Sequence, residues 1–199
     1  MGNLYKFLAG LVVVFVIFAI SFMTSYNKIP TLDENVVAKW SQVENQYKRR
    51  ADLVPNLVSV VQGYAKHEKT TLNEVVEARS KAISIKVDAQ SLSNPEAIKA
   101  YSEAQGALGS ALSRLIMLTE NYPELKANEN FLELQSQLEG TENRIAVARK
   151  DYIEATKEFN LALRTIPTKF IAKMFFPDLK PKEPFSVTAE EKAVPKVEF

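Results

Sequence analysis

The only histidine, His67, is the first residue whose chemistry the sequence must explain. It opens the dipeptide His67-Glu68, but Thr71 stands where a zinc-protease helix has its second histidine. The chain also lacks cysteine, which excludes disulfides, thiolate zinc sites and thiol nucleophiles. One histidine cannot build a conventional zinc site, so we expect no metal here and interpret His67 as a solvent-facing or helix-surface residue.

Small residues and carboxylates form two other groups that could do chemistry. The stretch Gly106-Ala-Leu-Gly109-Ser110 lacks the lysine of a phosphate-binding loop, and Ser110 falls inside a predicted helix instead of on a nucleophile elbow. We interpret these small residues as easing contact between helices. The carboxylates have basic neighbours at helical spacing, which is typical of solvated, self-paired faces; they include Glu139, Glu142, Asp151 and Glu154.

No catalytic or cofactor-binding residue is therefore assigned, and we expect a protein that is not an enzyme and binds no cofactor. An oxygen-ligand cation site between two helices stays open as an alternative, since carboxylates are plentiful. The 25 basic and 24 acidic residues give a formal net charge of +1. That balance lacks the basic excess that phosphate backbones select, so we expect no nucleic acid among the partners.

The elements that could position such residues begin with an apolar segment. Residues 7–23 carry no charge and follow a short tail, residues 1–6, so we predict a single transmembrane anchor that places the protein in a membrane. A cleaved secretory signal is the competing interpretation, with Ala19-Ile20-Ser21 as its cleavage site. Lys6 precedes the segment, whereas Lys28 and Lys39 follow it closely, which favours a cytoplasmic C-terminal domain.

Long helices are predicted for the rest of the chain. From Val36 to Ala82 apolar residues recur in a strict 4,3 alternation, which predicts one helix of about 50 residues, starting inside the capping box Thr31-Leu-Asp-Glu34. The alternation does not reset at Pro55, so we expect a kink there and not a turn.

Two further helices have clear start signals. Ser93 or Asn94 caps a helix with Pro95 in its first turn, which runs to about Thr119, and a third helix starts near Asn128. No window alternates long enough for a sheet. The sequence therefore predicts an all-α fold: an antiparallel up-and-down bundle of three to four helices over residues 31–176, with a long kinked first helix, preceded by a single N-terminal transmembrane helix. Residues 177–199 form a proline-containing tail.

The stretch WSQVENQYKRRADLVPNL, residues 40–57, contains the first candidate site. Its apolar residues lie on the core-facing stripe, and the long side chain of Arg50 can cross that stripe to reach a carboxylate of a facing helix. Packing explains most of the stretch, and a partner-binding surface is the alternative. The candidate partner-binding or packing residues are Trp40, Tyr47, Arg49, Arg50 and Pro55.

A second candidate site is the short basic and aromatic segment 167–176. Its residues suit either a cap on the bundle or a membrane surface; they are Lys169, Phe170, Lys173, Phe175 and Phe176. With three long helices the segment would end far from the bilayer, so we favour the cap. For residues 194–199 two interpretations stay open: docking along the bundle, or a terminal peptide offered to a partner.

The chain resembles the LemA family of bacterial membrane-anchored helical proteins. The strings that carry the resemblance include LDENVVAKWSQVENQYKRRADLVPNLV, GYAKHE, EARSKA, LTENYPELKANENFLELQSQLEGTENRIAVARKDYIEATKEFN and PKVEF, between about Thr31 and Phe199. The resemblance implies an N-terminal membrane helix, a helical bundle, a cytoplasmic domain behind a short external N-terminus, and no established enzymatic activity. Ile153 and the run Phe175-Phe176-Pro177 depart from the family pattern, which expects Asn and Phe-Gly-Phe.

Taken together, these features lead us to expect a non-enzymatic scaffold or adaptor of the bacterial cell envelope. Its anchor would contact membrane lipid, and its bundle would recruit protein partners or copies of itself as a homo-oligomer. The family resemblance names a membrane metalloprotease as one partner class, because some relatives are encoded beside such enzymes. The alternative is an exported ligand-binding domain that is released after cleavage of a signal peptide.

Overall fold

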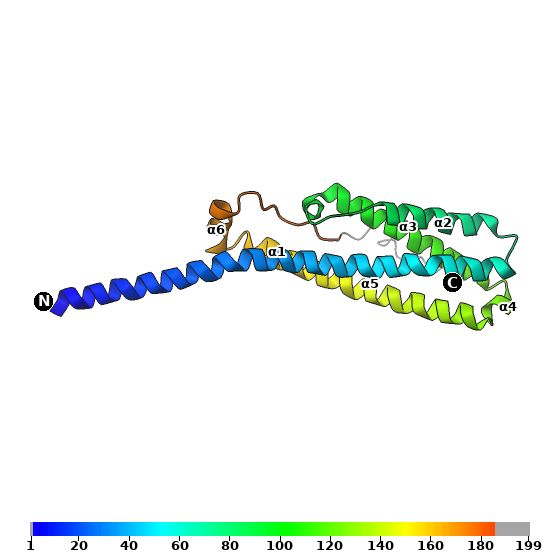
Figure 1. Ribbon diagram of the computed structural model, residues 1–199, viewed down its shortest axis with the longest axis horizontal. Helices are drawn as coiled ribbons and strands as arrows, with labels where there is room; N and C mark the ends of the chain where they lie inside the picture. Colours follow the sequence, from blue (N-terminus) through cyan, green and yellow to red (C-terminus); the bar gives the residue numbers. More distant parts are fainter. Residues whose placement is uncertain (1, 186–199) are drawn as a thin grey trace, which may run out of the picture.

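The computed structural model describes residues 2–185, and within that range the regular elements are all helices. They are α1 (Gly2–Tyr64), α2 (Lys69–Ser84), the 3-10 turn η1 (Ser91–Ser93), α3 (Pro95–Thr119), α4 (Pro123–Lys126), α5 (Glu129–Ala162) and α6 (Thr168–Phe175). Figure 1 shows α1, α2, α3 and α5 side by side and antiparallel, with the N-terminal part of α1 projecting beyond the bundle. The predicted all-α, up-and-down bundle is confirmed.

The start predicted for the first bundle helix is wrong. α1 is a single helix from Gly2 to Tyr64, and it passes through Pro30 and the expected capping box without a break. Thr31 Oγ1 donates to the carbonyl oxygen of Asn27 at 2.8 Å instead of capping a helix end. The reason is that the turn before Thr31 is already helical, so its carbonyls accept the N–H groups that a cap would have to satisfy.

The end predicted for this helix is also wrong. α1 stops at Tyr64, and a turn bonded from Ala65 N to Val61 O and from Glu68 N to Ala65 O leads into α2, which runs back along the bundle. The apolar stripes of both helices, including Leu57 and Val75, enter one buried cluster. Because both helices bury the same stripe on the same core, the 4,3 alternation continues across the turn and does not reveal it.

The helix starts predicted at two asparagines are confirmed. The side chain of Asn94 accepts a hydrogen bond from Glu96 N at 3.0 Å, and Pro95 occupies the first turn of α3. Asn128 accepts from Phe131 N at 3.0 Å at the start of α5. Each cap satisfies an N–H that the helix itself leaves unpaired, which is why these boundaries could be recognised locally.

Two buried clusters fill the bundle, and along α1 one lies before Arg50 and the other after it. The first surrounds Trp40 and holds Tyr101, Tyr152 and Phe159, whereas the second holds aliphatic residues such as Leu57 and Leu108. α1 packs along α5, and α2 packs along α3. The bundle is therefore two tight helix pairs, and the space between α3 and α5 is the less closely packed side.

After α6 the chain turns back along the bundle. Residues 177–185, which we name the return segment, begin with a turn at residues 177–178 and form no helix or strand. Asn160 exchanges two hydrogen bonds of 2.8 Å with the backbone of Lys182, and Glu183 N donates to Leu92 O at 2.8 Å. The Nζ of Lys182 also lies 2.9 Å from Asp33 Oδ1. These bonds fasten the segment to α1, α5 and η1, whereas residues 186–199, including the predicted docking peptide 194–199, lie outside the described residues.

Candidate functional site

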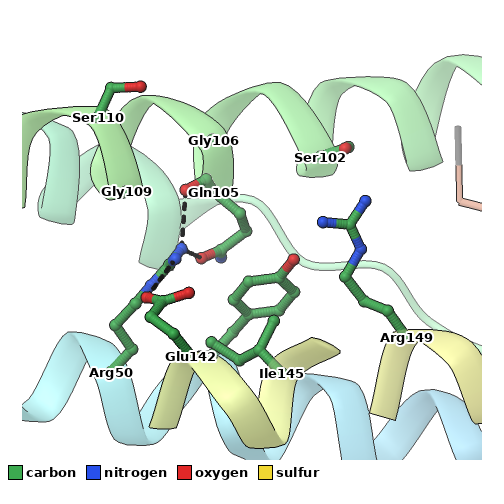
Figure 2. A pocket seen from close by; sticks show the side chains of 10 residues that line it. Arg50, Ser102, Gln105, Gly106, Gly109, Ser110, Glu142, Ile145 and Arg149 are labelled. Atoms are coloured by element: carbon green, nitrogen blue, oxygen red, sulfur yellow. Dashed lines mark hydrogen bonds and ion pairs between the residues drawn. The ribbon is translucent and has the colours of Figure 1, made fainter. Parts of the chain in front are cut away.

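Arg50 is a charged side chain in the middle of the bundle, with only 3% of its surface exposed. Its Nη1 donates to Glu142 Oε1 at 3.0 Å, and its Nη2 donates to the backbone oxygen and the Oε1 of Gln105, at 2.7 and 2.9 Å. Its guanidinium also lies over the ring of Tyr47, 4.9 Å from the centroid. The predicted pairing of Arg50 with a carboxylate of a facing helix is thus present, and it joins α1 to both α3 and α5 (Figure 2).

A pocket of about 270 Å³ opens beside this cluster, between α3 and α5. Figure 2 shows Arg50 and Glu142 at one end and Arg149 at the other. Its lining is mostly polar or small: Tyr47, Arg50, Ser102, Gln105, Gly106, Gly109, Ser110, Glu142, Ile145 and Arg149. Two guanidinium groups and one carboxylate around a space of this size suit a small polar or anionic ligand.

The interpretation of Gly106 to Ser110 as a close helix contact is wrong. A Cβ added at Gly106 would meet no atom within 4 Å, and one added at Gly109 would meet only Arg50 Nη1 at 3.4 Å. The glycines and Ser110 line the pocket instead of touching a neighbouring helix. The sequence shows that these residues are small, but only the spacing between α3 and α5 decides whether a helix or a pocket fills the room they leave.

Three residues at this pocket were not predicted as candidate site residues: Gln105, Glu142 and Arg149. Glu142 was assigned to a self-paired surface, but it pairs with Arg50 of another helix. Gln105 is 5% exposed and donates its Nε2 to Ala82 O at 3.1 Å, while Arg149 lies over the Phe185 ring at 5.1 Å. The position of Arg50 on the core-facing stripe was a signal for these partners, because a buried charge requires polar groups on the facing helices.

Tyr47 also lines the pocket, but the other residues of the first candidate site, Trp40, Arg49 and Pro55, do not. Trp40 is 2% exposed, donates its Nε1 to Val87 O at 3.0 Å and stacks on Phe185 of the return segment, with ring centroids 5.4 Å apart. Its burial fits the packing interpretation. Arg49 and Pro55 are both exposed on α1, and their role in partner binding stays a prediction.

Two tyrosines of the Trp40 cluster have perturbed acidity. Burial raises the pKa of Tyr152 to about 12, and Tyr152 donates its hydroxyl to Glu183 O at 2.8 Å. Burial, and then the negative charge of Glu44, raise the pKa of Tyr101 above its usual value. Both groups stay neutral around pH 7, so they contribute packing and hydrogen bonds instead of proton transfer.

The possible metal ligands of the described residues do not gather into a cluster. Within residues 2–185 no three His, Asp or Glu side chains lie close enough together to hold a metal ion. His67 lies exposed in the turn between α1 and α2, far along α1 from the Arg50 pocket. Its exposure agrees with the interpretation of His67 as a solvent-facing residue.

The location predicted for segment 167–176 is wrong. Four long helices, not three, make up the bundle, so α5 returns to the end at which α1 enters, and α6 packs against α1 there (Figure 1). Ile171 and Ala172 are buried against Ile29 of α1. The predicted cap exists, but it covers the membrane-proximal end of the bundle.

Aromatic contacts fasten α6 to α1. The ring of Phe175 lies 5.6 Å from those of Phe22 and Tyr26, edge to face in both cases, and the ring of Phe176 lies 5.1 Å from that of Tyr26. Lys169, Phe170 and Lys173 are exposed. We name this region, formed by residues 18–29 and 166–176, the juxtamembrane corner.

The N-terminal part of α1 has the properties of a membrane anchor. It contains an apolar stretch long enough to cross a membrane, and none of that stretch is buried within the protein. Large apolar side chains from Leu4 to Met23 are exposed along it. An exposed apolar surface of this extent fits membrane association, because water would not tolerate it on a free helix.

The sequence is similar to proteins of known families. It matches the LemA family model over residues 39–199. Magnetosome protein MamQ 2 of Paramagnetospirillum magneticum is 27% identical over 173 residues, which cover 79% of this chain and 64% of that protein. Magnetosome protein MamQ of Magnetospirillum gryphiswaldense is 25% identical, over 86% of this chain and 69% of that protein.

Protein LemA of Metamycoplasma hominis is 29% identical over 127 residues, which cover 63% of this chain and 53% of that protein. The chain thus spans just under two thirds of the length of MamQ 2 and about half the length of the mycoplasma protein.

Proposed function

Because this chain belongs to the LemA family, we propose that it is a bacterial membrane-anchored helical scaffold that acts through protein contacts or self-assembly. The observation that carries the proposal is the continuity of α1. One helix of 63 residues contains both the exposed apolar stretch and the buried residues Val36, Trp40 and Leu57 of the bundle core. At 1.5 Å per residue such a helix is roughly 95 Å long.

A helix shared by anchor and core holds the bundle at a set distance from the bilayer and in a set orientation. A flexible linker between anchor and bundle would allow the bundle to rotate and to approach the membrane. A continuous helix does not, because its backbone hydrogen bonds fix the relative orientation of its two ends. Fixed presentation of a surface is what a scaffold needs.

We propose that the bundle lies in the cytoplasm, as the basic residues after the span favour. The chain has no cysteine, so a single cysteine at His67, in the exposed turn at the far end of α1, can be labelled selectively. A membrane-impermeant maleimide should label this variant only after the cells are permeabilised. Labelling in intact cells would reverse the orientation.

Crosslinking in intact cells tests the scaffold itself. A photoreactive residue at Lys48 of α1, which is exposed on the bundle, should give adducts of defined mass that contain a protein partner or a second copy. The matched control is the same residue at Lys6, before the apolar stretch. A chain that gives no adduct at Lys48, nor at other exposed bundle positions such as Val147, would argue against a scaffold.

A second candidate function is favoured by the Arg50 pocket: binding of a small polar ligand by an exported domain. In that case cleavage near residue 21 would release a chain beginning at Phe22. N-terminal sequencing of protein from isolated membranes separates the two functions, because a start at Met1 excludes release. Thermal unfolding with inorganic phosphate or succinate as probes tests the pocket, and a rise in Tm that Arg149→Gln abolishes would support ligand binding.

A further inference from the structure

α6 leaves a stripe of large apolar side chains exposed. Phe170 and Met174 lie four residues apart on α6 and are 63% and 74% exposed, and Ile166, in the turn just before α6, is 74% exposed. Residues at this spacing share one side of a helix. The opposite side, with Ile171 and Ala172, is already buried on α1. A water-soluble bundle rarely exposes such a contiguous stripe, so a covering partner is expected.

The stripe lies at the level of the anchor. An apolar groove of about 320 Å³ runs between α1 and α6, and its lining includes Phe18 and Phe22 on one side and Phe170 and Met174 on the other. Phe18 and Phe22 belong to the uncharged stretch 7–23, and the first charged residue after that stretch is Lys28. If α1 crosses a bilayer, α6 must therefore lie beside the last turns of the span, at the boundary between acyl chains and headgroups.

The charges of this segment match that boundary. Arg164, Lys169 and Lys173 are exposed, and residues 159–177 contain no acidic residue. Helices that lie in the plane of a membrane combine an apolar side with lysine or arginine, because the basic side chains meet anionic headgroups. A soluble protein partner has no such reason to be restricted to the level of the span.

We infer that α6 is a second membrane-binding element, which lies in the interface of the leaflet where α1 leaves the bilayer. Ile166, Phe170 and Met174 enter the acyl region, and an acyl chain of a membrane lipid fills the groove between α6 and α1. Lys169 and Lys173 contact anionic headgroups. The element fixes how the anchor is rotated relative to the bilayer. The inference rests on the proposed anchoring by α1.

Site-directed spin labelling of the full chain tests this inference, because the absence of cysteine allows single labels. Labels at Phe170 and Met174 are compared with Val12 in the span and with Met117, which is 64% exposed near the end of α3 that faces away from the anchor. In vesicles of phosphatidylcholine and phosphatidylglycerol, positions 170 and 174 should resemble position 12. Each should be accessible to oxygen and shielded from a water-soluble nickel chelate, the reverse of position 117.

The other possible results distinguish failure of this inference from failure of the proposed anchoring. If 170 and 174 behave like 117 while 12 stays in lipid, this inference fails and the anchor stands. If position 12 is also accessible to nickel, the proposed anchoring fails. A third result is that positions 170 and 174 are shielded from both oxygen and nickel, and that this shielding disappears when the protein is diluted in lipid. It would mean that a second copy covers α6, and it would overturn the inference.

Charge variants test the headgroup contact. Adding phosphatidylglycerol to phosphatidylcholine vesicles should move the label at Phe170 deeper, and the variant Lys169→Gln/Lys173→Gln should lose that shift. The matched control Lys66→Gln/Lys69→Gln removes the same charge at the far end of the bundle and should keep it. Retention of the shift in the α6 variant would refute the role of its lysines.

Discussion

Nε of Arg79, on α2, lies 2.7 Å from the carbonyl oxygen of Ala51, on α1. This carbonyl is four residues before Pro55, which has no N–H to donate to it. Ala51 is 2% exposed, so water cannot easily replace the missing donor. A side chain from the neighbouring helix therefore repairs the defect that the proline creates, and Pro55 lies inside α1 without ending it.

The first prediction concerns this repair. Arg79→Ala should lower the free energy of unfolding by about 1–3 kcal/mol, because it leaves a buried carbonyl without a donor. In a Pro55→Ala background the helix supplies the N–H itself, so the same substitution should cost clearly less. Chemical unfolding of the full chain in detergent, followed by circular dichroism, measures the double-mutant cycle. Equal costs in both backgrounds would show that Arg79 and Pro55 are not coupled.

The second prediction ranks the contacts of Arg50. Arg50→Ala should destabilise the bundle by about 1–3 kcal/mol, because it leaves the buried Oε1 of Gln105 without its donor. Glu142→Ala should cost about 0–1 kcal/mol, because the Glu142 side chain is 47% exposed and water can replace it. Fluorescence of Trp40, the only tryptophan, reports both unfolding curves. A Glu142 variant as unstable as the Arg50 variant would contradict this ranking.

The third prediction is a loss of stability in alkali. The pKa of Tyr152 is raised from 10.0 to about 12 in the folded protein, mainly by burial. Above pH 10 the unfolded chain loses this proton while the folded chain keeps it, so stability is fully present below pH 10 and falls as the pH rises towards 12. Tyr152→Phe should flatten the decline by at most about 1.4 kcal/mol per pH unit. Urea unfolding at several alkaline pH values tests this, and an unchanged slope would contradict it.

The fourth prediction concerns the pocket glycines. Gly106→Ala should raise the free energy of unfolding by about 0.5–1 kcal/mol, because alanine favours the helix and its Cβ has room in the pocket. Gly109→Ala is the matched comparison, and its gain should be smaller because its Cβ would meet Arg50 Nη1 at 3.4 Å. Thermal unfolding compares the two. Destabilisation by Gly106→Ala would restore the interpretation of a close helix contact.

The fifth prediction concerns the cap of α5. Asn128→Ala should cost about 1 kcal/mol, because the N–H of Phe131 loses its acceptor at the start of the helix. Asn130→Ala provides the control: Asn130 is exposed in the same first turn and makes no capping bond that the structure describes. The control should change stability by less than about 0.5 kcal/mol. Similar losses for both variants would show that the cap contributes nothing of its own.

Local capping signals correctly predicted where α3 and α5 begin. Asn94, Pro95 and Asn128 act on N–H groups one to three residues away, so their effect does not depend on the rest of the fold. The core-facing positions of Trp40, Tyr47 and Arg50 were also readable, because helical spacing alone places them on one side of α1. Apolar length likewise identified the exposed apolar stretch of α1.

The number of helices was decided only by the tertiary structure. The apolar stripe of α1 continues in phase through the turn at residues 65–68 into α2, since both helices pack on the same core, and periodicity cannot distinguish a turn from a continuous helix. One additional helix reverses the direction of α5, which moves α6 from the far end of the bundle to the anchor. Likewise the Arg50 pocket exists because α3 and α5 stand apart. Features that depend on neighbours along the chain could thus be predicted from the residues alone, whereas features that depend on neighbours in space followed from the packing of the helices.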